Sequence, residues 1–222
     1  VPEKEKGPQD RPAPVRGNAL KTGIYGGTFN PIHRGHLHLL KEFTQRLSLD
    51  RVLLIPTHVP PHKAAPDLAS AKDRMEMCRL AAGSQPHLEL SDLEIRREGK
   101  SYTAETLEEL HVLYPRDELY LLMGEDMFLT VEHWYRPETI FFLATVCATP
   151  RSLHGMGKLQ AKKDEYQSRY GARCLLEDIP YLPVSSTQVR EYVKAGKDIA
   201  PLVPEAVADY IQTQGLYRGE TV

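Results

Sequence analysis

The sequence predicts an α/β fold in which a doubly wound parallel sheet carries helices on both of its faces. Two observations lead to this prediction. Segments with the pattern of strands and segments with the pattern of helices alternate along the chain at short intervals, which is typical of strands joined by helical crossovers. Several strand segments are almost entirely apolar, such as residues 51–55, in which only Arg51 is charged. Strands of that kind are buried on both faces of a parallel sheet.

The first unit of this pattern is predicted from glycines and from apolar spacing. A short strand over residues 22–25 ends at Gly26 and Gly27, and a helix begins after Gly35. A second strand over residues 51–55 is closed by a proline. Apolar residues recur on one face of the helix at helical spacing, at Leu40, Phe43 and Leu47.

The next helix has predicted boundaries at both ends. Ser70 and Asp73 have the spacing of a capping box, and Gly83 stands where glycine commonly ends a helix. The stretch before Ser70 is rich in proline and histidine and is expected to be a loop. Residues 87–90 follow as a third strand. A helix over 103–114 then has an apolar inner stripe at Leu107, Leu110 and Tyr114.

The second half of the chain continues the alternation. Strands are expected over residues 119–123, 145–149 and 174–179, and helices over 186–195 and 204–214. Residues 132–137, which hold the only tryptophan, are expected to be a loop, and the polar stretch 151–173 shows no clear period. This order predicts a Rossmann-like sheet, which binds ligands at the carboxyl ends of its strands, near the point where strand order reverses.

Composition is that of a soluble globular protein and excludes several functions. Of the 222 residues, 41% are hydrophobic and 26% are charged, and the formal net charge of -2 provides no field for gathering nucleic acid or anionic membrane. No apolar run approaches the roughly 18 to 20 residues of a membrane span, and no secretory pattern opens the chain. Three scattered cysteines form no CxxC pair and fit a reducing cytoplasm: Cys78, Cys147 and Cys174.

The first 19 residues are set apart by their composition. They are rich in proline and charge and hold almost no apolar mass. We interpret residues 1–19 as a disordered extension or an expression remnant, because such a segment has little surface to bury. Residues 20–222 are expected to form the functional domain, and a homo-oligomer is one of the assemblies that the sequence allows.

The residues that carry chemistry begin directly after the first predicted strand. The segment Gly26-Gly27-Thr28-Phe29-Asn30-Pro31-Ile32-His33-Arg34-Gly35-His36 fits neither the GxGxxG fingerprint nor the P-loop pattern. Its two leading glycines let a ligand come close to the backbone. His33 and His36 fall on one side of the first helical turn, where free N–H groups already attract anions. The segment therefore predicts a polyphosphate site.

Two further segments have the composition of anion sites. A Ser-Ser-Thr run that ends at Thr187 precedes a predicted helix, with Arg190 one turn further on. It is either an ordinary N-cap or a set of hydroxyl and N–H donors that face the same phosphates. The sequence Pro-Pro-His62-Lys63 follows the second strand. It is either a surface turn or a stiff loop with a positive tip.

In this order the segments resemble the HIGH-type nucleotidylyltransferase superfamily, through the HxGH motif His33-Arg34-Gly35-His36 and the run Ser185-Ser186-Thr187-Gln188-Val189-Arg190. Within that superfamily the chain is similar to the bacterial nicotinate-nucleotide adenylyltransferases. The similarity covers nearly the whole chain after Lys21. Its motifs are Val59-Pro60-Pro61-His62-Lys63, Ser101-Tyr102-Thr103-Ala104-Glu105-Thr106-Leu107, Gly124-Glu125-Asp126, Trp134-Tyr135 and Gly215-Leu216-Tyr217.

The resemblance implies that the adenylyl group of ATP moves onto the phosphate of nicotinate mononucleotide, giving nicotinate adenine dinucleotide and pyrophosphate in NAD biosynthesis. It implies catalytic roles for His33, His36 and Arg190. It implies ATP contacts at Gly26, Gly27, Thr28, Phe29, Gly124, Asp126, Ser186 and Thr187. It implies contacts with the mononucleotide at Thr57, His62, Lys63, Tyr102, Thr103, Trp134 and Tyr135.

The chain departs from the family pattern at two of these positions. The family commonly has Asp where this chain has Asn30, which removes a charge near the phosphates. Relatives that adenylate nicotinamide mononucleotide also often carry Asn there. The family commonly has Asn where this chain has Thr57, whose hydroxyl differs from an amide in reach and in number of donors.

The implied mechanism is an in-line attack by the mononucleotide's phosphate oxygen on the α-phosphorus of ATP. The attacking group is already an anion, so catalysis consists of alignment and of neutralising charge on the leaving pyrophosphate. We expect His33, His36, Arg190 and the helix N-termini to supply positive charge. Mg²⁺ is expected to be coordinated by the ATP phosphates. No metal ligands are assigned in the chain, because it contains no HExxH motif and no cysteine near the HxGH histidines.

Three alternatives remain open from the sequence. The acceptor could be nicotinamide mononucleotide or phosphopantetheine. The Tyr102-Thr103 and Trp134-Tyr135 pairs argue against the pantetheine acceptor. The chain could also be a nucleotide sensor without turnover, for which Asn30 is the only support.

Overall fold

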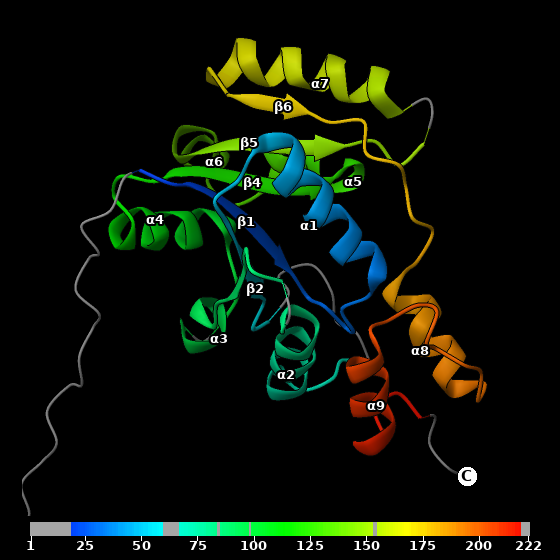
Figure 1. The fold of residues 1–222 in the computed structure, drawn as a ribbon. Coiled ribbons are helices and arrows are strands. Elements are labelled where there is room, and N and C mark those ends of the chain that lie inside the picture. Colours follow the sequence, from blue (N-terminus) through cyan, green and yellow to red (C-terminus); the bar gives the residue numbers. More distant parts are fainter. Residues whose placement is uncertain (1–18, 60–66, 84, 98, 153–154, 219–222) are drawn as a thin grey trace, which may run out of the picture.

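The structure is a computed structural model, and it describes residues 19–59, 67–83, 85–97, 99–152 and 155–218 (Figure 1). Six strands form one sheet in the order β3-β2-β1-β4-β5-β6, and every neighbouring pair is parallel. This order places the reversal of strand order between β1 and β4, as in a doubly wound sheet. The strands are β1 Lys21–Gly27, β2 Arg51–Pro56, β3 Leu88–Leu90, β4 Glu118–Gly124, β5 Ala144–Thr149 and β6 Cys174–Leu176.

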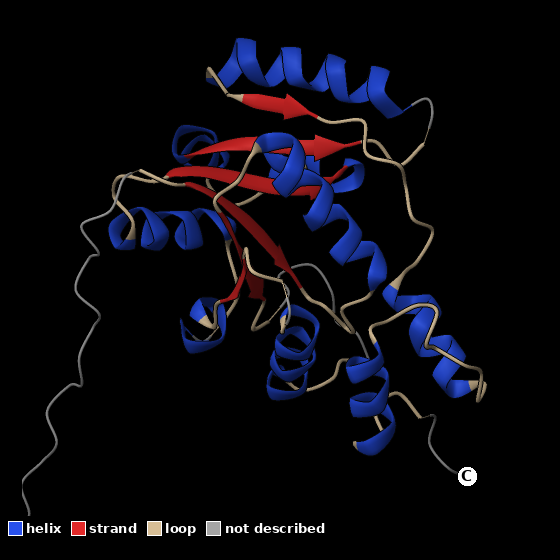
Figure 2. Ribbon diagram, in the orientation of Figure 1, coloured by secondary structure: helices blue, strands red, loops and turns tan. Residues whose placement is uncertain are grey.

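Helices cover both faces of the sheet, which confirms the predicted fold class (Figure 2). They are α1 Arg34–Leu47, α2 Ala71–Ala82, α3 Leu93–Arg97, α4 Thr103–Leu113, α5 Glu125–Phe128, α6 Pro137–Leu143, α7 Gly155–Tyr170, α8 Ser186–Lys194 and α9 Glu205–Thr213, with a 3₁₀ turn η1 at Val131–His133. One buried cluster joins the sheet to α1, α2, α8 and α9, and a second joins it to α3, α4, α5, α6 and α7. Successive strand residues point to opposite faces, so apolar strands such as Val52–Ile55 contribute to both clusters.

The predicted strands are all present, and the five predicted helices correspond to α1, α2, α4, α8 and α9. The sixth strand is shorter than predicted, because it ends at Leu176 rather than at residue 179. The Ser70 cap is also present, since its Oγ accepts a hydrogen bond from the Asp73 N–H at 3.1 Å. The capping box itself is incomplete, because the Asp73 carboxylate accepts from the Ser70 hydroxyl instead of reaching the N-cap backbone.

The sequence pattern does not predict the helical segments α3, α5, η1, α6 and α7. Helix α7 occupies most of the polar stretch 151–173, and its buried residues within the helix are only Gly155, Leu159 and Tyr166. So few apolar positions on a 16-residue helix leave no clear period. The loop expected over 132–137 is wrong in part, since η1 ends at His133 and α6 begins at Pro137. Of the proposed N-terminal extension, residues 1–18 lie outside the described residues.

Candidate active site

Several of the predicted site residues lie near the point where the strand order reverses. Gly27 ends β1 and pairs with Pro56 at the end of β2, while Gly124 ends β4 and pairs with Thr149 of β5. Because parallel strands end at the same edge of the sheet, the glycine-rich segment after β1 and the Gly-Glu-Asp segment after β4 lie at that edge. The N-termini of α1 and α5 begin there as well.

His33 and His36 form a reciprocal cap at the start of α1. The Nδ1 of His33 accepts a hydrogen bond from the His36 backbone N–H at 3.3 Å, and the Nδ1 of His36 accepts one from the His33 N–H at 3.2 Å. The rings stack with centroids 3.6 Å apart. Since both Nδ1 atoms accept, the hydrogen-bond network assigns the ring proton of each neutral imidazole to Nε2. Each histidine is therefore an Nε2–H donor.

Two glycines allow this arrangement. A Cβ on Gly35 would lie 3.1 Å from two ring atoms of His33 and 3.3 Å from the Val184 carbonyl oxygen. A Cβ on Gly27 would lie 2.9 Å from the Phe29 ring, which in turn meets the His36 ring edge-on at a centroid distance of 5.2 Å. Phe29 is buried, with 3% of its surface exposed, and its ring supports His36. The glycines thus provide room for the histidines as well as for a ligand.

Burial disfavours the charged form of both imidazoles. Burial lowers the pKa of His33 to about 4. Burial, and then the neighbouring His33, lower the pKa of His36 well below its ordinary value. The positive charge expected on both histidines is therefore disfavoured in the protein without ligand. Desolvation disfavours the imidazolium, and the cap bonds use the lone pair that a second proton would need.

Helix α8 brings the second predicted motif to the first across 155 residues of sequence. Ser185 is the N-cap, and its Oγ accepts from the Gln188 N–H at 3.1 Å. The Ser186 hydroxyl donates to the Pro31 carbonyl at 2.8 Å, and Arg190 donates to the Asn30 carbonyl at 2.8 Å and to the Thr187 hydroxyl at 3.4 Å. Both sequence interpretations of the Ser-Ser-Thr run are consequently compatible, because it caps α8 and lies beside the histidine loop.

Asn30 has a structural reason to be an amide. Its Nδ2 donates to the Asp67 carbonyl at 2.9 Å, while its Oδ1 accepts from the Ala69 N–H at 3.0 Å and from the Tyr217 hydroxyl at 2.8 Å. Tyr217 belongs to the Gly-Leu-Tyr sequence that closes the similarity to the adenylyltransferases. The amide of Asn30 thus joins the histidine loop to two distant segments. This structural role explains why the position holds Asn, and no loss of catalytic activity is needed to explain it.

Arg74 is a functional candidate that the sequence analysis missed. It is 1% exposed, and its guanidinium donates to four backbone carbonyls. Nε reaches Ala69 at 3.1 Å, one terminal nitrogen reaches Thr28 at 3.0 Å and Thr57 at 2.6 Å, and the other reaches His58 at 3.0 Å. Arg74 therefore holds the loop after β1 against the loop after β2. Arg74 could have been identified in the sequence from its position, because it lies on the same helical face as the buried Met77, Cys78 and Ala81.

The loop after β2 holds one described candidate. Thr57 donates its backbone N–H to the Gly27 carbonyl at 2.9 Å, so it lies beside the glycine pair. Its hydroxyl oxygen is buried, with no hydrogen-bond partner in the part of the chain that the structure describes. The predicted residues His62 and Lys63 lie outside the described residues.

A cleft runs from His36 past the ends of β4 and β5. Its first part is lined by residues that include Gly35, His36, Leu39, Thr149 and Tyr181. The adjoining part shares several of these residues and continues over the N-terminus of α5, where its lining includes Gly124, Asp126 and Arg151. Arg151 forms an ion pair with Asp126 at 2.7 Å and donates to the Tyr181 hydroxyl at 3.3 Å. The sequence analysis did not predict Arg151 or Tyr181, since neither lies in a recognised motif.

The predicted aromatic residues also come together. The rings of Tyr102, at the N-cap of α4, and Tyr135 lie 4.6 Å apart between centroids. Trp134 is half-buried, and its Nε1 donates to the Thr130 hydroxyl at 3.2 Å. Thr103 opens α4, and no side chain caps this N-terminus among the residues described. Free N–H groups at a helix N-terminus, next to aromatic rings, suit a planar ligand that carries an anionic group.

Other classes of site find little support in the described part of the chain. Within it, no group of three or more His, Cys, Asp or Glu side chains could hold a metal ion. None of its helices is long and apolar enough to cross a membrane. Cys78, Cys147 and Cys174 are free and buried.

Comparison with known proteins gives concordant similarities. The family described as cytidylyltransferase-like matches residues 24–192. A Dehalococcoides mccartyi protein named "Probable nicotinate-nucleotide adenylyltransferase" is 39% identical over 204 residues, covering 90% of this chain and 98% of its own. A protein of the same name from Clostridium tetani is 35% identical over 198 residues, covering 89% of this chain and 99% of its own.

Solved structures agree in fold. The nicotinic acid mononucleotide adenylyltransferase of Plasmodium falciparum, complexed with NaAD, superposes with a TM-score of 0.73 at 21% identity, over 89% of this chain and 97% of that one. The same enzyme complexed with APC superposes with a TM-score of 0.71 at 20% identity, over the same shares of the two chains. At this identity the likeness concerns the arrangement of strands and helices alone.

Proposed function

This chain belongs to the nicotinate-nucleotide adenylyltransferases, within the cytidylyltransferase-like family, and we propose how its residues carry out that reaction. The enzyme transfers the adenylyl group of ATP to nicotinate mononucleotide in NAD biosynthesis. The products are nicotinate adenine dinucleotide and pyrophosphate. Residues 20–222 make up the nucleotidyltransferase domain in this proposal.

The reciprocal histidine cap is the observation that carries the proposal. It places two Nε2–H donors at the N-terminus of α1, beside Arg190 of α8 and at the point where strand order reverses. Neutral donors of fixed direction can bind phosphate oxygens without the cost of burying two imidazolium ions. These Nε2–H groups can donate to the triphosphate and stabilise the charge that grows on the leaving pyrophosphate.

The ATP site in this proposal follows the cleft. The triphosphate lies between the glycine-rich segment and the N-terminus of α8, with donors from His33, His36 and Arg190. The adenosine extends toward the ends of β4 and β5. The proposed contacts are Gly26, Gly27, Thr28, Phe29, Gly124, Asp126, Ser186 and Thr187, to which the cleft adds Arg151 and Tyr181. Because Phe29 is buried, its contribution goes through the His36 ring that it supports.

The acceptor site in this proposal lies on the other side of the glycine pair. The phosphate of the mononucleotide is held by Thr57, His62 and Lys63. The backbone N–H of Thr57 donates a hydrogen bond to the Gly27 carbonyl. The remaining contacts frame the pyridine ring, at Tyr102, Thr103, Trp134 and Tyr135. The free N–H groups of α4 face the nicotinate carboxylate, whose charge they favour.

The reaction needs no covalent intermediate on the protein. An oxygen of the mononucleotide phosphate forms a bond to the α-phosphorus of ATP while the bond from that phosphorus to the bridging oxygen of pyrophosphate breaks. The attacking oxygen carries no proton, so no residue need remove one. The protein contributes alignment of the two nucleotides and donors for the departing charge.

Mg²⁺ belongs to the substrate in this proposal, as MgATP. The ion would keep most of its water and bind the triphosphate, since it prefers oxygen ligands in octahedral geometry. A cytoplasmic location is also proposed, supported by the three free cysteines.

Release of pyrophosphate from ATP in the presence of each acceptor tests the function. We expect release with nicotinate mononucleotide, less with nicotinamide mononucleotide and none with phosphopantetheine. The absence of release with any acceptor would favour a sensor. Asn30 was the only residue that favoured a sensor, and its three hydrogen-bond partners now explain why it is an amide.

A further inference from the structure

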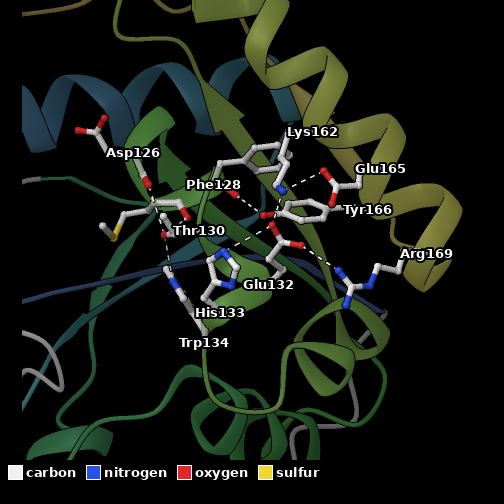
Figure 3. Close-up of polar contacts among 11 residues, drawn as sticks. Asp126, Phe128, Thr130, Glu132, His133, Trp134, Lys162, Glu165, Tyr166 and Arg169 are labelled. Atoms are coloured by element: carbon white, nitrogen blue, oxygen red, sulfur yellow. Dashed lines mark hydrogen bonds and ion pairs between the residues drawn. The ribbon is translucent and has the colours of Figure 1, made fainter.

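The Trp134–Tyr135 pair is attached to the rest of the protein on both sides. On one side, Arg136 donates to the Glu108 carboxylate at 2.6 and 3.0 Å, which ties the pair to α4. On the other side, Glu132 points into a group of cations and has a side chain that is only 8% exposed. Figure 3 shows its carboxylate between Lys162 and Arg169 of α7.

Helix α7 supplies two of the three partners of Glu132, and the third is the neighbouring His133, whose Nε2 lies 3.7 Å from the carboxylate. Lys162 donates to one carboxylate oxygen of Glu132, and Arg169 donates to the other at 3.2 Å. Lys162 also bonds to Glu165 at 2.9 Å, and its side chain is 17% exposed, so it is the inner cation of the group. The hydrogen bond from Lys162 holds the pKa of the Glu132 carboxyl below its ordinary value.

The same face of α7 holds the segment at a second point. Tyr166, which is fully buried, donates its hydroxyl to the Phe128 carbonyl at 2.8 Å. Lys162, Tyr166 and Arg169 recur at helical spacing, so one stripe of α7 contacts the backbone at Phe128 and the side chain of Glu132. Both contacts lie within a few residues of the tryptophan.

Short hydrogen bonds connect this anchored segment to Trp134. The indole Nε1 donates to the Thr130 hydroxyl, and that hydroxyl lies 3.0 Å from the Met127 carbonyl, to which it can donate (Figure 3). Hydrogen bonds thus link the stretch from Met127 to Trp134 into one unit. A shift at Glu132 would move the indole.

We propose that Lys162 and Tyr166 of α7 are positioning residues that place Trp134 for binding of the pyridine mononucleotide. This proposal rests on the proposed role of Trp134 at the acceptor ring. Neither side chain touches substrate. Their effect is on affinity for the acceptor, because the indole must be held in one orientation to cover the ring. ATP binding at the histidine cap does not depend on this contact.

Lys162→Met is the variant that tests the idea. It keeps the length of the side chain and removes the charge, so Glu132 loses its inner partner. Lys158→Met, one turn earlier on an exposed part of the same helix, is the matched control. We expect Lys162→Met to raise KM for nicotinate mononucleotide about tenfold while KM for ATP and kcat change less than about threefold. Lys162→Arg should restore most of the affinity, and Lys158→Met should behave as the wild type.

The tryptophan itself provides a second readout. Trp134 is the only tryptophan in the chain, so its fluorescence reports on this segment without background. In the protein without ligand, Lys162→Met should change the emission maximum and increase quenching by acrylamide, and titration with nicotinate mononucleotide should show the same loss of affinity. In a Glu132→Gln background, adding Lys162→Met should have little further effect, since the carboxylate is already absent.

The outcomes separate this proposal from the proposed function. Equal rises in KM for ATP and for the acceptor, or unchanged indole fluorescence and acceptor affinity, would overturn the positioning role. A wild-type protein that releases no pyrophosphate would instead contradict the function, and the fluorescence of the variants without ligand would still decide whether α7 positions Trp134. If Lys162→Met does not fold, Tyr166→Phe removes only one hydroxyl and should give a smaller shift of the same fluorescence and of the same KM.

Discussion

His33 and His36 cap the same helix turn reciprocally, each ring accepting a hydrogen bond from the other residue's backbone N–H. In an ordinary capping box a Ser or Thr and a Glu perform these two tasks. Imidazoles perform them with one nitrogen and keep the second, with its proton, available. The local structure of the helix and the direction of the two donors are therefore determined by the same pair of bonds.

The first prediction concerns His36. Replacement by Ala should lower kcat by about 10² or more, because a donor directed at the developing charge is lost. Replacement by Gln should lower kcat much less, since its amide oxygen can accept from the His33 N–H while its NH₂ donates outward. Steady-state rates of pyrophosphate release, with a thermal melt of each variant, provide the test. A His36→Ala variant with normal melting and near-normal turnover would show that His36 has no such role.

The second prediction is a dependence of stability on pH. Burial lowers the pKa of His33 to about 4 in the folded protein, whereas the unfolded chain takes up this proton near pH 6.5. Between these values the unfolded state binds more protons, so the free energy of unfolding falls as pH drops from about 6.5 to about 4. The contribution is at most about 3.5 kcal/mol, at about 1.4 kcal/mol per pH unit.

Thermal melts between pH 7.5 and 4.5 can measure this contribution. His33→Asn is the comparison, because Asn is a good N-cap and does not titrate. The wild type should lose more stability than His33→Asn over this range. Parallel curves for the two proteins would mean that His33 takes up its proton in the folded and unfolded states alike.

The third prediction concerns Arg74. Its guanidinium spans four carbonyls, whereas a lysine has one nitrogen and cannot reach all of them. Arg74→Lys should therefore lower the free energy of unfolding by about 2 to 4 kcal/mol, since buried carbonyls lose their donors. It should also raise KM for both ATP and the acceptor, because it loosens the loops at Thr28 and Thr57 together.

Arg79→Lys is the control for Arg74→Lys. Arg79 lies on the same helix, has a side chain that is 61% exposed, and pairs only with Glu76 among its described contacts. Chemical denaturation and the two KM values should be unchanged in this control. A change confined to one substrate in Arg74→Lys would show that Arg74 serves a single loop.

The fourth prediction concerns the choice of acceptor. Nicotinate and nicotinamide differ by a carboxylate against an amide, and both rings stack equally well. Charged hydrogen bonds contribute roughly 1.5 to 3 kcal/mol each, so the N–H groups at the start of α4 and the Thr103 hydroxyl should favour nicotinate mononucleotide at least about tenfold in kcat/KM. Thr103→Val should reduce this ratio, while Trp134→Ala should weaken both acceptors similarly. Comparison of kcat/KM for the two acceptors is the test. Equal use of them would contradict the proposed specificity but not the proposed adenylyl transfer.

The sequence by itself determined the features that depend on local order. Alternating apolar segments predicted the parallel sheet, and the glycine pair, HxGH and Ser-Ser-Thr motifs predicted the edge of the sheet where we propose the site. Some of the candidates are in contact, such as His33 with His36 and Tyr102 with Tyr135. Such patterns are readable because helix caps and strand ends involve neighbouring residues.

Only the tertiary structure decided the charges and the distant partners. The sequence predicts cationic histidines, but burial favours their neutral form. In the sequence Asn30 looks like a lost charge, whereas in the fold it forms hydrogen bonds with Asp67, Ala69 and Tyr217. No sequence motif includes Arg74 or the contact of Lys162 with Glu132. The reason is physical: desolvation and long-range hydrogen bonds depend on which segments the fold places side by side, and residue types at short spacing do not report this.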